Sequence, residues 1–189
     1  MFEDFTAAFS VDEAGGSPWE PPAEVVPGFA EVVRRWGGLS FRSGLYRVHT
    51  EASSASATAA IRPLLPARAA DAVAFGFDWQ GRVFAVSPGR WPAVLLVDFG
   101  GGEVFEIPGD LAHFHDVELV RHPDAALDHR LFADWRLANR GAALPFDRCV
   151  GYRVPLFLGG PDDDANLEVV DTDVYWTVTA QVYARVSGQ

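Results

Sequence analysis

The chain has 189 residues, of which 49% are hydrophobic and 13% aromatic, so it has enough apolar material for one packed core. Its formal net charge is −11, and all 15 basic residues are arginine. A surface this negative repels phosphate backbones and anionic lipid, which argues against nucleic-acid or membrane binding and favours a basic protein partner. There is no apolar run of about 18 residues, no leader-like start and only one cysteine, so we expect a cytoplasmic protein.

The N-terminal segment is predicted to be a short helix, because Phe2, Phe5 and Phe9 fall on one helical face. A run rich in Gly, Ser and Pro follows, which is typical of an extended linker. We therefore divide the chain into residues 1–22, a helix with a Pro/Gly linker, and residues 23–189, a single α+β domain.

The middle of the chain is predicted to be rich in strands. A helix from Pro27 to Trp36 ends at two glycines, and a Ser/Ala-rich stretch leads into a second helix that ends near Pro63. Four short apolar runs follow, separated by turn residues such as Gln80-Gly81 and Pro88-Gly89. They cover residues 72–79, 83–87, 93–99 and 103–107. The pattern predicts an antiparallel meander, with Val94–Val97 as a buried central strand.

Helices are predicted again after the meander. Asp110 is placed to cap one helix, and Pro123 to begin a longer one that ends near Arg140. The last segment alternates apolar and polar residues, which is typical of a strand, but Asp171 and Thr172 are good helix caps. We favour the helix, with the strand as the alternative. The fold class is α+β: a central, mostly antiparallel meander packed with helices, plus the short N-terminal helical segment.

The cluster most like a metal site is formed by His113, His115 and Asp116. Imidazoles two residues apart share a face on a strand but diverge by about 200° on a helix, and this stretch is predicted to be helical. No partnered Cys/His spacing completes a zinc site, so we predict neither a metal nor a cofactor. A small metal-dependent hydrolase that uses these three residues is the enzymatic alternative.

No catalytic motif is recognisable. Cys149 lacks a Cys–His signature, and Gly100–Gly102 lies between two predicted strands rather than before a helix. Asp78, Trp79 and Arg82 are the candidate lining of a small pocket, for which a β-turn closed by an Asp–Arg ion pair is the simpler interpretation. We predict no catalytic residue and no enzymatic activity.

Carboxylates concentrate in a C-terminal block that contains no basic residue. We predict that this block contacts a basic partner, with Tyr175 as an aromatic anchor if it is exposed. The acidic members are Asp162, Asp163, Asp164, Glu168, Asp171 and Asp173.

Several motifs together resemble a bacterial family. The run Phe75–Arg82, FGFDWQGR, matches "FGxDWxGR", and Gly102–Pro108, GEVFEIP, matches "GEVxEIP". An "FH" segment at Phe114-His115 follows, and the most specific block runs from Cys149 to Trp176, with CVGYRVPLFLGG, NLE and VYW. These residues resemble the Tdi-type type VI secretion immunity proteins, in particular their C-terminal domain, and more loosely the SUKH immunity superfamily. The resemblance covers roughly Trp36 to Gln181.

The resemblance implies a protein that binds and neutralises a cognate toxin, often a nuclease. Because nucleases need a cationic surface for phosphates, an acidic inhibitor suits such a target. Our leading hypothesis is an immunity protein that binds a basic toxin stoichiometrically, without turnover, as a monomer or weak homodimer. The alternatives are the hydrolase described above and a module that binds a ligand or peptide in an aromatic pocket near Asp78, Trp79 and Tyr175.

Overall fold

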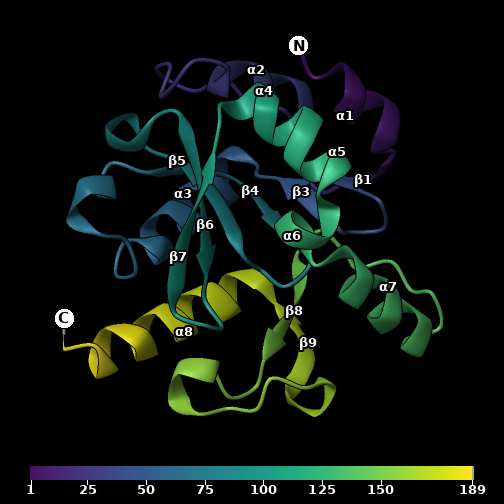
Figure 1. Cartoon of the computed structure of the whole chain (residues 1–189), viewed down its shortest axis with the longest axis vertical. Helices are drawn as coiled ribbons and strands as arrows, with labels where there is room; N and C mark the ends of the chain where they lie inside the picture. Colours follow the sequence, from purple (N-terminus) through teal and green to yellow (C-terminus); the bar gives the residue numbers. More distant parts are fainter. Residues whose placement is uncertain (189) are drawn as a thin grey trace.

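The computed structural model describes residues 1–188, and in this part of the chain seven strands form one antiparallel sheet. The strands lie in the sheet in the order of the chain, so the sheet is a meander (Figure 1). They are β1 (Val11–Ala14), β2 (Leu39–Phe41), β3 (Tyr46–Val48), β4 (Val73–Asp78), β5 (Val83–Val86), β6 (Ala93–Asp98) and β7 (Glu103–Pro108). A separate hairpin pairs β8 (Arg148–Tyr152) with β9 (Leu167–Asp171). The predicted α+β fold with a central antiparallel meander is confirmed.

Helices cover both faces of the sheet, which creates two hydrophobic cores (Figure 1). The smaller core lies between the sheet and the pair α3 (Glu51–Ile61) and α8 (Thr172–Val186). The larger core lies under seven other helical segments. These are α1 (Glu3–Ala8), α2 (Phe29–Trp36), α4 (Leu111–His113), the π-helical turn η3 (Phe114–Glu118), α5 (Leu119–Arg121), α6 (Pro123–Leu127) and α7 (His129–Ala138).

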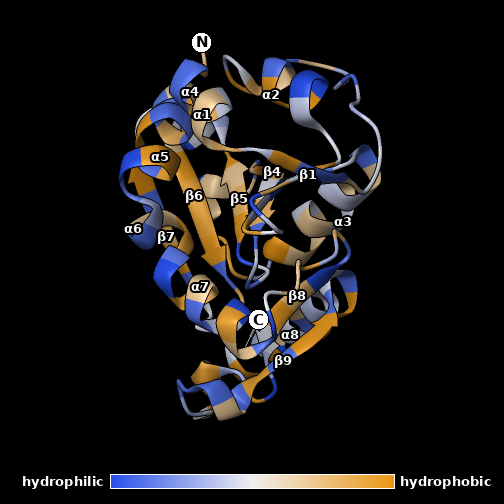
Figure 2. Ribbon diagram, turned by 90° about the vertical axis from the view of Figure 1, so that its right-hand side faces the viewer, coloured by the Kyte–Doolittle hydropathy of each residue, from blue (hydrophilic) through white to orange (hydrophobic). Residues whose placement is uncertain are grey.

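The central strands are apolar on both faces, as the sequence predicts for Val94–Val97. Along β6, Val94 and Leu96 enter the larger core, whereas Leu95 and Val97 enter the smaller one. This is the period-two alternation of a strand buried between two layers. Figure 2 shows β6 and its neighbour β5 as a hydrophobic centre, with hydrophilic residues on the helices around them.

A bulge in β4 directs one aromatic ring to the opposite face of the sheet. The register with β5 shifts between Ala74 and Gly76. Phe75 therefore packs in the larger core, while Phe77, two residues later, packs in the smaller core beside α3 and α8. In a regular strand, side chains two residues apart point to the same face, so the bulge is what separates the rings of Phe75 and Phe77.

The N-terminal segment is part of this architecture. α1 forms as predicted, and Phe2, Phe5 and Phe9 are buried in the larger core. Between α1 and the Gly/Ser/Pro run, residues 11–14 form β1, which pairs antiparallel with β2. The run itself contacts the domain, since Gly15 N donates to Gly38 O at 2.8 Å and Trp19 N to Val33 O at 3.3 Å. Asp116 on η3 accepts hydrogen bonds from the backbone N–H groups of Phe2 and Phe5, both at 3.0 Å. The three phenylalanines bury more apolar surface docked on the sheet than exposed on a tether.

The C-terminal segment is the helix α8, so the favoured alternative was correct. Asp171 caps it by accepting a hydrogen bond from the Val174 N–H at 3.1 Å. Its buried residues Tyr175, Trp176, Thr179 and Ala180 follow the spacing of three and four of a helix face. The strand-like alternation has no structural counterpart, because capping and burial of this face decide the conformation.

The long helix predicted from Pro123 to Arg140 is divided in two at Asp128. This residue has a left-handed backbone, with φ of 48°, between α6 and α7. Its carboxylate lies 2.7 Å from Nη1 of Arg82, which arrives from the β4–β5 turn. Asp tolerates the left-handed region better than most residues, and here an ion pair holds it there.

The β4–β5 turn is the point at which distant elements meet. Trp79 N donates to Leu45 O at 3.2 Å, Val150 N of β8 donates to Trp79 O at 2.8 Å, and the Trp176 indole of α8 donates to Gly81 O at 2.7 Å. The turn therefore ties β8 and α8 to the main sheet. The FGFDWQGR motif is a buried structural junction.

Substitution of Gly81 by alanine should destabilise this junction by about 1–3 kcal/mol. Gly81 has φ of +76°, and an added Cβ would lie 3.0 Å from Sγ of Cys149 and 3.3 Å from the Tyr175 ring. Gly159→Ala is the matched control, because Gly159 has φ of +84° but nothing within 4 Å. Urea unfolding should show the larger loss for Gly81→Ala. Equal losses would mean that backbone strain alone decides the effect.

Candidate functional site

The candidate pocket at Asp78, Trp79 and Arg82 is a buried ion cluster rather than an open site. Asp78 accepts hydrogen bonds from the N–H groups of Gln80 and Arg82, both at 3.0 Å, and from Arg82 Nε at 2.6 Å. Burial raises the pKa of Asp78, and the Arg82 guanidinium opposes that rise. The Trp79 indole donates to Leu127 O at 2.9 Å. These contacts fix the turn against α6. The structure therefore agrees with the simpler interpretation, a β-turn closed by an Asp–Arg ion pair.

The histidine cluster does not converge on a common point. His115 is fully buried: its Nδ1 lies 2.7 Å from Leu111 O and its Nε2 lies 3.1 Å from the Tyr46 hydroxyl. Because a carbonyl only accepts, Nδ1 carries the proton and Nε2 accepts from Tyr46. Asp116 binds the start of α1, while His113 is exposed beside Glu118 at 3.1 Å. Within residues 1–188, no three His, Cys, Asp or Glu side chains are grouped so as to hold a metal ion.

The other groups with shifted pKa values also serve the fold. Burial raises the pKa of the Cys149 thiol to about 12, which is the opposite of what a nucleophilic cysteine requires. Burial lowers the pKa of His115 to about 4 and that of His49 to about 3, with the Arg47 charge as a further cause for His49. None of these three groups is poised for proton transfer near neutral pH.

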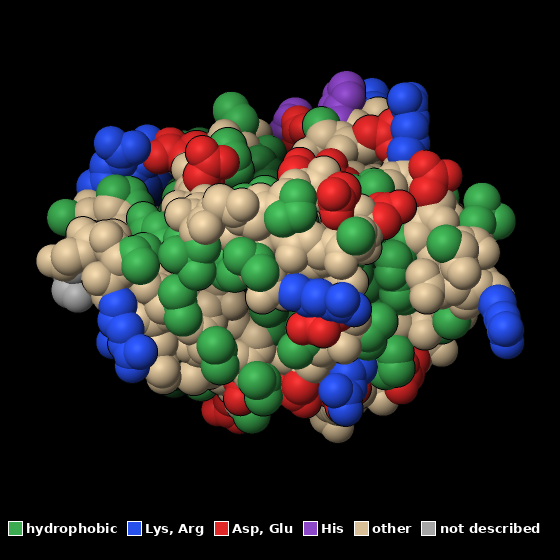
Figure 3. All heavy atoms as spheres, turned by 90° about the horizontal axis from the view of Figure 1, so that it is seen from below, with side chains coloured by type: hydrophobic (Ala, Val, Ile, Leu, Met, Phe, Trp, Pro, Cys, Tyr) green, Lys and Arg blue, Asp and Glu red, His purple; other side chains and the backbone are tan. Residues whose placement is uncertain are grey.

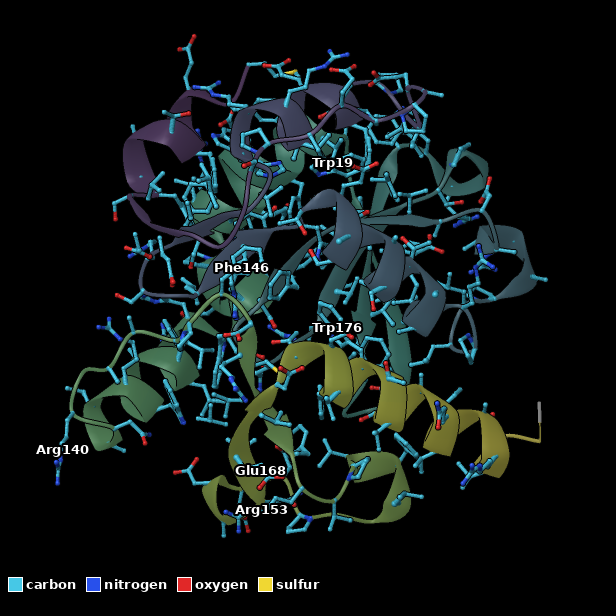
Figure 4. All side chains as sticks on the ribbon, turned by 180° about the vertical axis from the view of Figure 1, so that it is seen from behind. Trp19, Arg140, Phe146, Arg153, Glu168 and Trp176 are labelled. Atoms are coloured by element: carbon cyan, nitrogen blue, oxygen red, sulfur yellow. The ribbon has the colours of Figure 1, made fainter. Side chains whose placement is uncertain are left out.

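The acidic C-terminal block is divided between two places. Asp162, Asp163, Asp164 and Glu168 lie in or beside the β8–β9 hairpin, whereas Asp171 and Asp173 lie at the N-terminus of α8. β9 links the two groups, and its residues Glu168 and Asp171 are three positions, or about 10 Å, apart. On the hairpin, Glu168 Oε2 lies 3.3 Å from Arg153 Nε, and Figure 4 shows these two side chains together. Figure 3 shows acidic and apolar side chains intermingled on the face seen from below.

Several of these carboxylates also stabilise their own segment. Asp162 accepts from the Tyr152 hydroxyl at 2.6 Å, and Asp163 accepts from the Ala165 and Asn166 N–H groups. Asp164 is exposed. The acidic block is therefore accessible to solvent, but Asp162 and Asp163 already accept hydrogen bonds within their own segment.

Tyr175 is not an exposed anchor. It is 6% exposed, and its ring packs against Gly151 of β8 and Gly81 of the β4–β5 turn. An added Cβ on Gly151 would lie 2.5 Å from the ring. The expectation that Tyr175 contacts a partner is therefore wrong, because its position on α8 faces the core.

A pocket that the sequence did not reveal lies where the N-termini of α3 and α8 meet the 144–147 loop. Its volume is about 260 Å³. Three aromatic rings line it: Phe77 from β4, Phe146 from the loop and Trp176 from α8. Phe77 and Trp176 meet edge to face at a centroid distance of 5.3 Å, and Phe146 meets Phe77 at 5.5 Å. Figure 4 shows Phe146 and Trp176 beside the first turns of α3.

Arg47 positions the loop that carries Phe146. Its guanidinium is buried and donates to the carbonyl oxygens of Pro145 at 3.1 Å, Phe146 at 3.4 Å, Arg148 and, from β4, Asp78 at 2.8 Å. Its Cζ also lies 4.4 Å from the centroid of Phe77. Burial lowers its pKa to about 10, so the group stays charged at neutral pH. One buried arginine thus supports both the ring and the loop of the pocket.

Acidic side chains border this pocket. Asp147, Asp171 and Asp173 all contribute to its lining. Asp171 is occupied as the cap of α8, and Asp173 accepts a hydrogen bond from Ser56 Oγ of α3. Asp147 is exposed, with Arg148 Nε 3.9 Å from its Oδ1. Asp171 and Asp173 had been predicted as partner contacts. The structure places Asp147 and the aromatic rings beside them in one pocket.

Comparison with known proteins gives a fold neighbour. No family model and no curated protein matches the chain. Among solved structures, the chain is similar to Atu4351 from Agrobacterium tumefaciens, with a TM-score of 0.63 and 17% sequence identity. The match covers 96% of this chain and 89% of that chain. At this identity the likeness shows a shared fold alone. Among the described helices, none has both the length and the apolar character to cross a membrane.

Proposed function

We propose that the protein is a non-catalytic inhibitor that binds a basic protein toxin, the role that the resemblance to type VI secretion immunity proteins implies. The observation that carries the proposal is the exposed carboxylate rim of the pocket between α3 and α8. Asp147 and Asp173 are both exposed there, and Glu51 is exposed in the first turn of α3. Exposed carboxylates of one sign attract a cationic surface and accelerate its association.

The positions of the shifted pKa values support binding rather than catalysis. Catalytic sites usually place groups with perturbed pKa values in an open cleft. Here the strongly shifted groups Arg47, His49, His115 and Cys149 are buried and packed against structural partners. Tyr152, whose pKa is also raised, is half-buried and its hydroxyl is bound to Asp162. The groups that solvent can reach are mainly carboxylates, which suit recognition of a cation.

The test is to search the neighbouring genes for a toxin, to co-express any toxin found there, and to measure kinetics with the purified pair. We expect the protein to protect cells and to form a stoichiometric complex whose association rate falls as salt is raised. Asp147→Asn/Asp173→Asn should slow association more than Glu31→Gln/Asp134→Asn, a control with the same loss of charge on α2 and α7. Failure to protect, or a rate independent of salt, would contradict the proposal.

A further inference from the structure

We infer that the pocket between α3 and α8 receives a single arginine side chain of the protein partner. The inference rests on the proposed function for the nature of that partner. The pocket itself supplies the chemistry, through its size, its aromatic rings and its carboxylates.

The size and lining suit one long, flat side chain. Sites for drug-sized ligands occupy about 300–1,000 Å³, whereas this pocket measures about 260 Å³. Its lining is mainly apolar: Phe77 and Trp176 are buried and form the floor, whereas Phe146 is half-buried and Ala52 is exposed at the mouth. The methylene stem of an arginine packs on such a surface, and its planar guanidinium can stack on the accessible ring of Phe146.

The charge balance selects a cation over an anion. The N-termini of α3 and α8 each carry the equivalent of roughly +0.5 charge, which alone would attract an anion. Glu51 in the first turn of α3 and Asp171 as the cap of α8 offset these two ends. Asp147 and Asp173 remain at the rim, and the nearby cations are Arg148 and the buried Arg47 beside Phe77. Four carboxylates against two arginines and two helix ends leave roughly one net negative charge, which disfavours an entering phosphate or carboxylate.

The hydrogen-bond donors and acceptors of the pocket also favour a cation over an anion. The Trp176 indole N–H is already bound to Gly81 O at 2.7 Å, so it offers no donor to an anion. The Thr172 hydroxyl is buried beside the Cys149 thiol, so the acceptors that the pocket offers are the carboxylates of Asp147 and Asp173. A guanidinium brings five N–H donors, enough for both carboxylates.

Arginine fits better than lysine for a geometric reason. The guanidinium is planar and pairs with a carboxylate through two parallel hydrogen bonds while its face stacks on a ring. An ammonium group is compact and strongly hydrated, so it gains less from a pocket walled by aromatic rings. Arg47 is no competitor for the site, because its N–H groups already bind four carbonyl oxygens.

The test uses the full chain and a small probe, so it does not depend on finding the toxin. N-acetyl-arginine methylamide is titrated into labelled protein and followed by NMR. We expect saturable shifts confined to Ser53, Ser56, Phe146, Asp147 and Trp176, with millimolar affinity. The citrulline analogue, which keeps the shape but lacks the charge, should bind at least tenfold more weakly.

Variants separate the pocket from the rest of the acidic surface. The double variant Asp147→Asn/Asp173→Asn should bind the arginine probe at least tenfold more weakly. Glu31→Gln/Asp134→Asn should leave the affinity unchanged, because neither control position lines the pocket. Equal binding of the citrulline or lysine analogue would overturn the assignment. So would binding of inorganic phosphate at the same residues. A micromolar affinity for the free probe would also overturn it, because it would mark a small-molecule site. If the probe binds but the protein does not neutralise the toxin, the proposed function fails and the assignment of the pocket stands.

Discussion

Deletion of residues 1–22 is expected to abolish cooperative folding. Phe2, Phe5 and Phe9 leave the larger core with the deleted segment, and each buried phenylalanine contributes about 1.5–3 kcal/mol. Their combined loss of roughly 5–9 kcal/mol is comparable with the whole stability of a typical domain, 5–15 kcal/mol. Loss of β1 also uncovers the edge of β2. Thermal unfolding followed by circular dichroism should show no sharp transition.

A milder change in the same segment keeps this prediction testable if the truncated chain aggregates. Phe5→Ala should cost about 3–5 kcal/mol, because the Phe5 ring packs against Trp36 at 4.8 Å and His115 at 5.0 Å. Ala7→Ser, at an exposed position of α1, is the control and should have little effect. If residues 23–189 alone melted within a few degrees of the full chain, the N-terminal segment would be an appendage after all.

Acidification from pH 7.5 to pH 5 is expected to lower the free energy of unfolding by about 4 kcal/mol through two histidines. The folded pKa values of His49 and His115, about 3 and about 4, lie below the unfolded value of about 6.5. Below pH 6.5 the unfolded chain therefore binds two protons that the folded chain excludes. The stability is complete above pH 6.5 and falls by about 2.7 kcal/mol per pH unit below it, until the folded values are reached.

Urea unfolding at several pH values measures this slope directly. His115→Gln should remove about half of it, because one of the two excluded protons is lost. His122→Gln is the control, since His122 is exposed and should leave the slope unchanged. Exposed carboxylates add little between pH 7.5 and pH 5, because their ordinary pKa values lie near 4. The raised pKa values of buried Asp78 and Asp98 act in the opposite sense to the histidines, because a folded state that binds protons more readily gains stability as the pH falls. A stability that stays constant over this range would show that neither imidazole is kept neutral by the fold.

The meander could be predicted because its signals are local. Gly81, Pro88-Gly89 and Gly100–Gly102 separate apolar runs of strand length, and β4 to β7 lie where these runs were placed. The strands β2 and β3 have three residues each, too few to show a period. The hairpin β8–β9 also escaped prediction, because its strands are separated by fourteen residues that include two 3₁₀ turns. Its pairing depends on tertiary contacts such as Val150 N to Trp79 O.

The candidate site could be predicted only in part, since its members are far apart in the chain. Asp171 and Asp173 stood out as carboxylates in a block without bases, whereas Phe146 and Asp147 carried no signal in their own neighbourhood. Phe77 reaches the pocket because the β4 bulge reverses its face, and a bulge leaves little trace in a sequence. Tyr175 was misplaced for the opposite reason: Asp173 and Val174 before it are exposed, but its helical phase turns it inward together with Trp176.

The separation of α3 and α8 along the chain has a consequence for the order in which the molecule can fold. Both helices cover the smaller core, yet 110 residues (62–171) lie between them in the sequence. Because the ribosome makes the chain from its N-terminus, α3 emerges well before α8, and the sheet face beside α3 stays uncovered until Trp176 and Ala180 have been made. The pocket takes its lining from both helices, so it cannot form before α8 has emerged.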